Sequence, residues 1–83
     1  MKVNPMKPVS RVMSGPVLVA SIIRQGNGRP GSPVRWVTYW SPIAQRLGAP
    51  TPQGFTSRHE AEAAALLWAA RRLGQAAHVE RAR

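Results

Sequence analysis

Two stretches of the chain have the residue pattern of β-strands. Residues 16–23, PVLVASII, are rich in β-branched side chains and have the length of a strand. Residues 34–41, VRWVTYWS, alternate between two faces, with Val34, Trp36, Thr38 and Trp40 on one and Arg35, Val37 and Tyr39 on the other. The intervening RQGNGRPGSP has glycines and prolines in close succession, which is typical of a loop. The pattern therefore predicts a hairpin.

From residue 57 the pattern has a helical period. Ser57 and Glu60 have the spacing of a capping box, and alanine dominates the residues that follow. Apolar residues recur on one stripe, formed by Leu66, Ala69 or Ala70, Leu73 and Ala77. Two glutamates near the beginning, and Arg71 and Arg72 later, complement the helix dipole. We expect a helix that begins after Ser57, with Gly74 ending its packed part and QAAHVERAR either continuing it or fraying.

The remaining segments predict a connector and an arm. Residues 42–54, PIAQRLGAPTPQG, hold three prolines and two glycines, so we expect a connector in which IAQRL forms one turn, before a short third strand that ends at Phe55. Residues 1–14 carry only positive charge and show no clear period, which predicts a flexible basic arm. Residues 15–83 are then one α+β domain: a small antiparallel β-sheet of two or three strands packed on one C-terminal α-helix.

The tryptophans of the second strand could serve either a ligand or the core. Trp36 and Trp40 share one face, about 13 Å apart, and could stack on unpaired bases. Because tryptophan supplies a large buried area, we favour packing on the helix. The expected apolar partners there are Leu66, Trp68 and Leu73. Arg35 and Tyr39 then face outward and become candidates for contact with a partner.

The charge balance points to an anionic partner. The chain has 83 residues with 12 lysines and arginines against 3 acids, a formal net charge of +9. It has no aspartate, and its first acid is Glu60, so every cation from Lys2 to Arg58 precedes any carboxylate in the sequence. An ordinary solvated surface intersperses both signs. We therefore expect a nucleic acid or an acidic protein as the partner.

Catalytic and metal chemistry find little support. The chain has no cysteine and only two histidines, which makes a poor metal site, and no cofactor is expected. Glu60 and Glu62 are two apart on a helix and face different ways, so they do not form a catalytic pair, and we expect no enzyme.

GNGRPG, residues 26–31, spells G-x-G-x-x-G, but a nucleotide site needs a helix after that loop. A hairpin loop with Arg29 at its tip is the simpler interpretation.

No segment is expected to cross a membrane. The apolar residues 16–23 are far fewer than the about 20 that a spanning helix needs. No cleavage site with small residues follows them, so a signal peptide is not indicated, and we expect a cytoplasmic protein. The oligomeric state is left open.

One segment resembles a known DNA-binding module. FTSRHEAEA, residues 55–63, preceded by a hairpin with Trp36 after its turn, is similar to the end of the arm-type DNA-binding domain of phage tyrosine integrases. In that family an aromatic strand residue, a Ser or Thr cap and a basic pair lead into a helix behind a three-stranded sheet. The sheet's outer face enters the DNA major groove, so the resemblance implies contacts by Arg24, Arg35 and Tyr39.

Two further resemblances keep other partners open. SRHEAEAAALLWAA, residues 57–70, looks like the last helix of double-stranded-RNA-binding domains, in which the basic pair, here Arg58 and His59, faces phosphates. The small size, one-sided charge and lack of catalytic motifs resemble, in kind only, phage products such as anti-CRISPR proteins, which bind a host machine.

The function predicted is non-enzymatic binding of nucleic acid, duplex DNA in preference to RNA, by a protein of phage or mobile-element origin. The alternative is a phage-encoded inhibitor of a host defence nucleoprotein. The predicted contact residues are Arg24, Arg29, Arg35, Tyr39, Arg46, Arg58 and His59.

Overall fold

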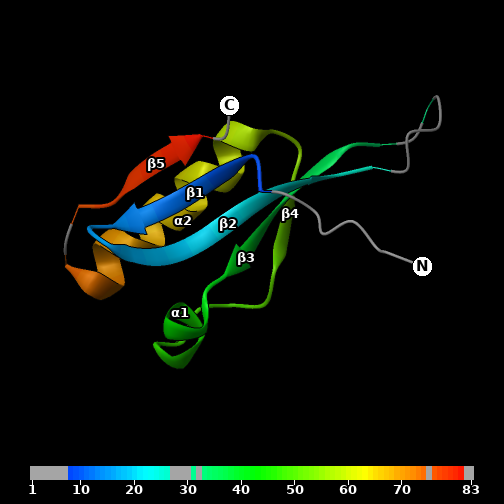
Figure 1. The fold of residues 1–83 in the computed structure, drawn as a ribbon. Coiled ribbons are helices and arrows are strands. Elements are labelled where there is room, and N and C mark those ends of the chain that lie inside the picture. Colours follow the sequence, from blue (N-terminus) through cyan, green and yellow to red (C-terminus); the bar gives the residue numbers. More distant parts are fainter. Residues whose placement is uncertain (1–7, 27–30, 32, 75, 82–83) are drawn as a thin grey trace, which may run out of the picture.

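The computed structural model describes residues 8–26, 31, 33–74 and 76–81, and within them it shows one antiparallel sheet and two helices (Figure 1). In chain order the elements are β1 (Ser10–Ser14), β2 (Val17–Gln25), β3 (Arg35–Trp40), α1 (Pro42–Arg46), β4 (Gln53–Phe55), α2 (Arg58–Leu73) and β5 (His78–Arg81). The strand order in the sheet is β4-β3-β2-β1-β5. The α+β class is confirmed, whereas the expected two or three strands and one helix are too few.

The elements with strong local signals form as expected. β2 and β3 pair antiparallel as a hairpin, and β4 ends at Phe55. The single turn is α1, which has a proline in its first turn. At the beginning of α2 the Ser57 Oγ accepts a hydrogen bond of 3.1 Å from the Glu60 N–H. Gly74 ends this helix with a φ of 65°, a left-handed conformation that glycine adopts without strain.

The two ends of the chain differ from expectation. The predicted arm of residues 1–14 is wrong for its last part, because Ser10–Ser14 form β1; residues 1–7 lie outside the described residues. The C-terminal segment neither continues the helix nor frays, because His78–Arg81 form β5. Figure 1 shows β1 and β5 side by side, and they pair antiparallel. A strand of four or five residues has too few positions for a clear alternation, which is why the sequence pattern missed both.

Alanines bring α2 close to one face of the sheet. Ala61, Ala65 and Ala69 are each 0% exposed and recur every four residues, so they form one stripe along the helix. Because their side chains are small, the helix backbone approaches the strands closely, and the Thr38 Oγ1 of β3 donates a hydrogen bond of 3.2 Å to the Ala61 carbonyl. The buried stripe is therefore shifted from the expected one, in which Leu66 and Leu73 were central; both are only partly buried.

The tryptophans pack on the helix side, as predicted. Trp40 is buried, and its ring lies 5.2 Å from that of Trp68 on α2, measured between centroids, at an interplanar angle of 54°. Trp36 is partly buried against the same core. Since successive residues of a strand point to opposite faces, Arg35 and Tyr39 lie on the other side of the sheet.

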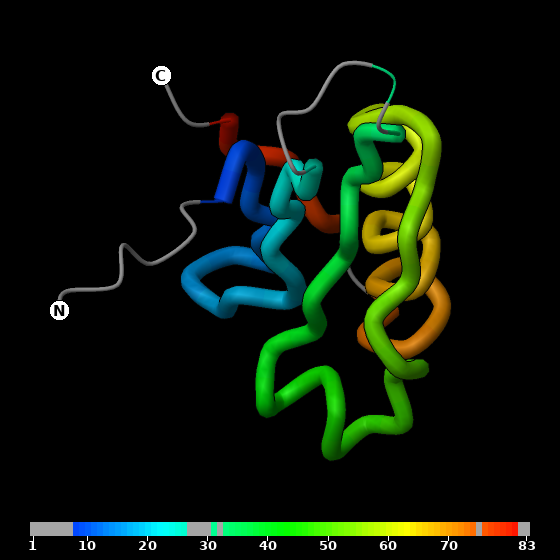
Figure 2. The backbone as a smooth tube through the Cα atoms, turned by 90° about the vertical axis from the view of Figure 1, so that its right-hand side faces the viewer, coloured from blue at the N-terminus to red at the C-terminus, as the bar shows by residue number. Residues whose placement is uncertain are grey.

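That other side, the open face, has no helix on it among the described residues (Figure 2). Directly paired residues of neighbouring strands share a face, so the register fixes its members. They are Arg11 and Met13 of β1, Ser21, Ile23 and Gln25 of β2, Arg35, Val37 and Tyr39 of β3, and His78 and Glu80 of β5.

Candidate nucleic-acid interface

An arginine counts as unpaired where no carboxylate lies within salt-bridge distance of it, so we first locate the three glutamates. The Glu60 Oε1 accepts a hydrogen bond of 3.3 Å from the Thr56 Oγ1. The Glu80 Oε2 lies 3.0 Å from the His78 Nε2. Glu62 is paired with two arginines, as described below. Among the residues that the structure describes, the arginines without a carboxylate partner are Arg11, Arg24, Arg35, Arg46, Arg71 and Arg72.

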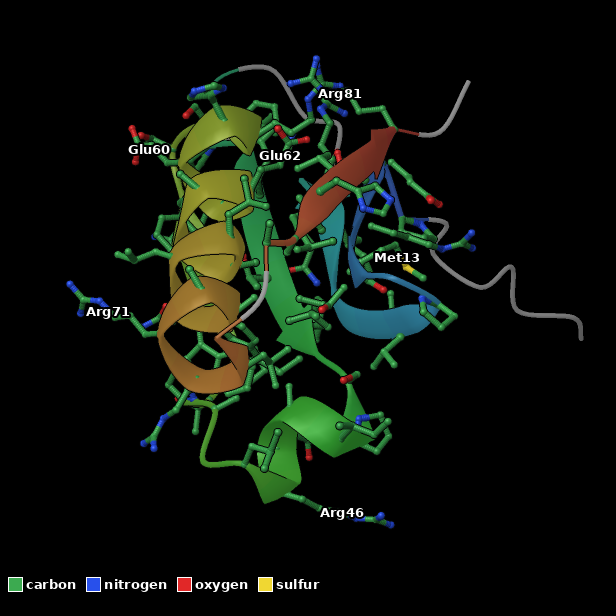
Figure 3. The ribbon with its side chains drawn as sticks, turned by 90° about the vertical axis from the view of Figure 1, so that its left-hand side faces the viewer. Met13, Arg46, Glu60, Glu62, Arg71 and Arg81 are labelled. Carbon is green, nitrogen blue, oxygen red and sulfur yellow. The ribbon has the colours of Figure 1, made fainter. Side chains whose placement is uncertain are left out.

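Glu62 is the centre of a polar cluster, which we call the Glu62 cluster and define as Ser10, Arg58, Glu62 and Arg81. Glu62 is 3% exposed and accepts a hydrogen bond from the Ser10 Oγ. Its two oxygens accept from the Arg81 Nη2 at 3.0 Å and from the Arg81 Nε at 3.4 Å. The Arg58 Nε lies 3.8 Å away. Figure 3 shows Glu62 pointing from α2 toward Arg81, whereas Glu60 points away from the sheet.

The cluster keeps Glu62 ionised at neutral pH. Burial by itself raises the pKa of Glu62, but hydrogen bonds from Arg81 and Ser10 and the charges of Arg81 and Arg58 outweigh burial, so the pKa lies below its ordinary value. The same carboxylate raises the pKa of Arg81. A cation at the beginning of a helix, the positive end of the helix dipole, is unfavourable. The ion pair of Arg58 with Glu62 offsets this unfavourable position.

The open face presents two arginines without carboxylate partners and a polar pair between the strands. Arg11 lies beside Ser21, which lies beside Tyr39 on the next strand. The Tyr39 hydroxyl accepts a hydrogen bond from the Gln25 amide, and Gln25 lies beside Arg35. Arg11 and Arg35 lie two strands apart, a separation of about 10 Å perpendicular to the strands. Arg35 is also four residues from Tyr39, the residue level with Arg11 on β3, which adds about 13 Å parallel to the strands.

The stem of Arg35 lies beside Gly54 of β4. A Cβ at Gly54 would lie 3.5 Å from the Arg35 Cδ, so the arginine stem runs over this glycine. The stem thereby covers part of the sheet while its guanidinium stays exposed, as is usual for long cationic side chains.

The structure separates Arg24 from Arg35 and Tyr39. Arg24 pairs directly with Trp36, whose side is the helix side of the sheet. The expectation that these three residues share one outer face is therefore wrong for Arg24. The reason is the register of the hairpin, because a shift of one residue moves a whole strand's side chains to the other face.

The other predicted contact residues are scattered. Arg46 is exposed on α1, away from Arg81 and Glu62 (Figure 3). Arg58 belongs to the Glu62 cluster. His59 is exposed on α2, where it lines a groove of about 410 Å³ with Leu66 and Val79. Arg29 lies outside the described residues. Of the predicted residues that the structure describes, it brings only Arg35 and Tyr39 together on one face.

The sequence-based set missed Arg11 and Gln25. Arg11 was assigned to the arm, and Gln25 was placed in the loop after the first strand. The sequence shows no clear alternation of apolar and polar residues in this strand, because Ser10 is polar although it lies on the buried side together with Val12.

Neither a metal centre nor a membrane span is visible in the part of the chain that the structure describes. No group of three or more His, Cys, Asp or Glu residues there could hold a metal ion. None of the described helices has the length and apolar character that crossing a membrane requires.

Comparison with known proteins finds no matching family model, no matching curated protein and no matching solved structure. The assignment of function therefore rests on the chemistry of the surface.

Proposed function

We propose that this protein is a non-enzymatic binder of duplex DNA that contacts the DNA backbone through its open face. The observation that carries the proposal is the presence of Arg11 and Arg35 on the uncovered side of the sheet with no carboxylate partner in the described structure. Glu80, the acid on this face, lies directly across from Arg11 in the register of β1 and β5, but it forms no ion pair with Arg11 in the described structure and lies 3.0 Å from the His78 Nε2. The overall charge of +9 adds long-range attraction for a polyanion.

The shape of the hairpin suits a duplex groove. Figure 1 shows the ends of β2 and β3 nearest their connecting loop extending as a two-stranded ribbon beyond α2. Such a ribbon fits the major groove of DNA, which is about 12 Å wide. With the open face toward the DNA, Arg35 and Arg11 reach phosphates, and Tyr39 and Gln25 add hydrogen-bonding groups between them. Each phosphate contact releases condensed counterions, so binding weakens as salt rises.

Arg24 and Arg35 offer a matched test, because they lie on the same hairpin and differ in the face they occupy. Each is replaced by alanine, and binding to a fluorescein-labelled DNA duplex is measured by anisotropy at several salt concentrations. We expect Arg35→Ala to weaken binding several-fold and to reduce the slope of log K against log salt by about 1. Arg24→Ala, with the same loss of charge, is expected to have the smaller effect. An RNA duplex of the same sequence tests the preference for DNA.

Two outcomes contradict this proposal. Equal losses for Arg24→Ala and Arg35→Ala would show that charge, and not the open face, governs binding. Failure to bind either duplex at low salt would remove nucleic acid as the partner.

The second candidate is inhibition of a host defence nucleoprotein, favoured by one observation: Leu67 is 53% exposed on α2, and an exposed apolar side chain beside cations suits a protein surface. Co-purification with one defined host complex after nuclease treatment would support that alternative.

A further inference from the structure

A second surface lies on the helix side of the molecule, away from the open face. It is a groove of about 390 Å³ between α2 and the segment that leads from α1 to β4. Its lining includes Trp40, Gln53, Leu67, Trp68, Arg71 and Arg72, and we call these residues the helix groove. Figure 3 shows Arg71 projecting outward from the last turns of α2. Because it shares no residue with the open face, the helix groove could bind a different ligand.

The apolar part of the helix groove is available and held in place. Leu67 is 53% exposed, although it lies next to the half-buried Trp68. The contact between the rings of Trp68 and Trp40 fixes the aromatic wall. The buried Trp40 Nε1 has no hydrogen-bond partner among the described residues. A buried N–H without an acceptor costs free energy, so the Trp40 ring is held in place by packing and not by a hydrogen bond of its indole nitrogen.

The charged part of the helix groove is exclusively cationic. Arg71 and Arg72 lie in the last turn of α2, and neither pairs with a carboxylate in the described structure. Gly48 faces Arg72 across the groove, because a Cβ at this glycine would lie 3.5 Å from the Arg72 Nη2. Two guanidinium groups therefore flank an apolar wall, an arrangement that complements a ligand with both carboxylates and an apolar side chain.

We propose that the helix groove binds an acidic peptide segment of a partner protein, with an apolar side chain on Leu67 and Trp68 and carboxylates on Arg71 and Arg72. Residues 1–7 and 82–83 contain no acid, so these residues do not supply the carboxylates. A second copy brings a further net charge of +9. A duplex phosphate backbone would satisfy the arginines but leave Leu67 and Trp68 uncovered.

The test uses the full chain and a synthetic, fluorescein-labelled peptide in which glutamates and aspartates flank a central Phe-Leu pair. One control peptide has Ser-Gly in place of Phe-Leu, and another has lysines in place of the acids. Binding is measured by anisotropy for the wild type, the double variant Arg71→Ala/Arg72→Ala, Leu67→Ser, and Arg46→Ala, which removes an unpaired arginine outside the groove. Circular dichroism confirms that each variant is folded.

We expect saturable binding of the acidic Phe-Leu peptide, at least about tenfold weaker binding by the double arginine variant and by Leu67→Ser, and little change for Arg46→Ala. Equal binding of the Ser-Gly peptide would overturn the proposal, because it would show attraction by net charge alone. Absence of saturable binding would overturn it as well. If the double arginine variant weakened DNA binding as strongly as Arg35→Ala does, the groove would serve nucleic acid and not a peptide. The outcomes of the peptide measurements do not depend on whether the open face binds DNA.

Discussion

The Glu62 cluster and the open face use the same side chain in opposite ways. In the cluster, Arg58 and Arg81 surround a buried carboxylate that joins α2 to β1 and β5. On the open face, Arg11 and Arg35 have no carboxylate partner in the described structure. With 12 basic residues and 3 acids, the placement of the acids decides which arginines stabilise the fold and which can bind a partner.

Glu62 connects both terminal strands to α2. A buried charge is costly unless it is paired and hydrogen-bonded, and each partner of Glu62 comes from a different part of the chain. Ser10 is 52 residues away in the sequence, and Arg81 is 19 residues away. The carboxylate therefore holds β1 and β5 to the helix at an end of the sheet where the strands themselves are short.

Removing the carboxylate is the change with the largest expected effect on this comparison. Glu62→Ala leaves Ser10 and Arg81 without their acceptor, and we expect a loss of about 2–3 kcal/mol in the free energy of unfolding. This is less than for a fully buried ion pair, because both arginines are partly exposed. Urea denaturation measures the loss. Glu60→Ala, which removes an exposed acid on the same helix, is the control; equal losses would mean that the cluster has no special role.

Replacing one arginine in each region separates the two roles. Arg81→Ala is expected to lower the free energy of unfolding, because it removes hydrogen bonds to a carboxylate, with only a small effect on DNA binding. Arg11→Ala is expected to weaken DNA binding several-fold and to change stability by less than about 0.5 kcal/mol. Denaturation and anisotropy on both variants check this, and a reversed pattern would break the division between the regions.

The smallest expected effect is a dependence on pH that belongs to the cluster alone. Since the pKa of Glu62 is lower in the folded protein than its ordinary value of 4.5, the stability that its charge contributes is fully present above that value. It is lost as the pH falls through the lower folded pKa. The difference in unfolding free energy between the wild type and Glu62→Gln should therefore shrink on acidification. Arg11→Ala should show no such trend relative to the wild type; a difference between wild type and Glu62→Gln that does not change with pH would argue against the cluster.

The elements that the sequence predicted well are those with a long local pattern. The alternation of β3 and the cap at Ser57 depend on neighbouring residues, so the hairpin and α2 could be predicted. β1 and β5 could not, because their helix-side positions include the polar Ser10 and Arg81, which are accommodated only through Glu62. Polar residues at such positions hide the alternation on which strand prediction depends.

The candidate interface was predictable only in part. Arg35 and Tyr39 were expected to face outward, because their place opposite the tryptophans follows from the strand period. Arg24 was assigned to the wrong face, since the register of a hairpin depends on the geometry of its loop and not on either strand alone. Arg11 was missed together with β1.

The sequence by itself determined the charge balance, the hairpin and the capped helix, because these depend on composition and on residues close together in the chain. The tertiary structure decided which arginines are free. That outcome depends on Ser10, Arg58 and Arg81 meeting Glu62, and most of these contacts join distant parts of the sequence. A carboxylate can neutralise only the cations that folding brings within a few ångströms of it, so the surface left for a partner is a property of the fold.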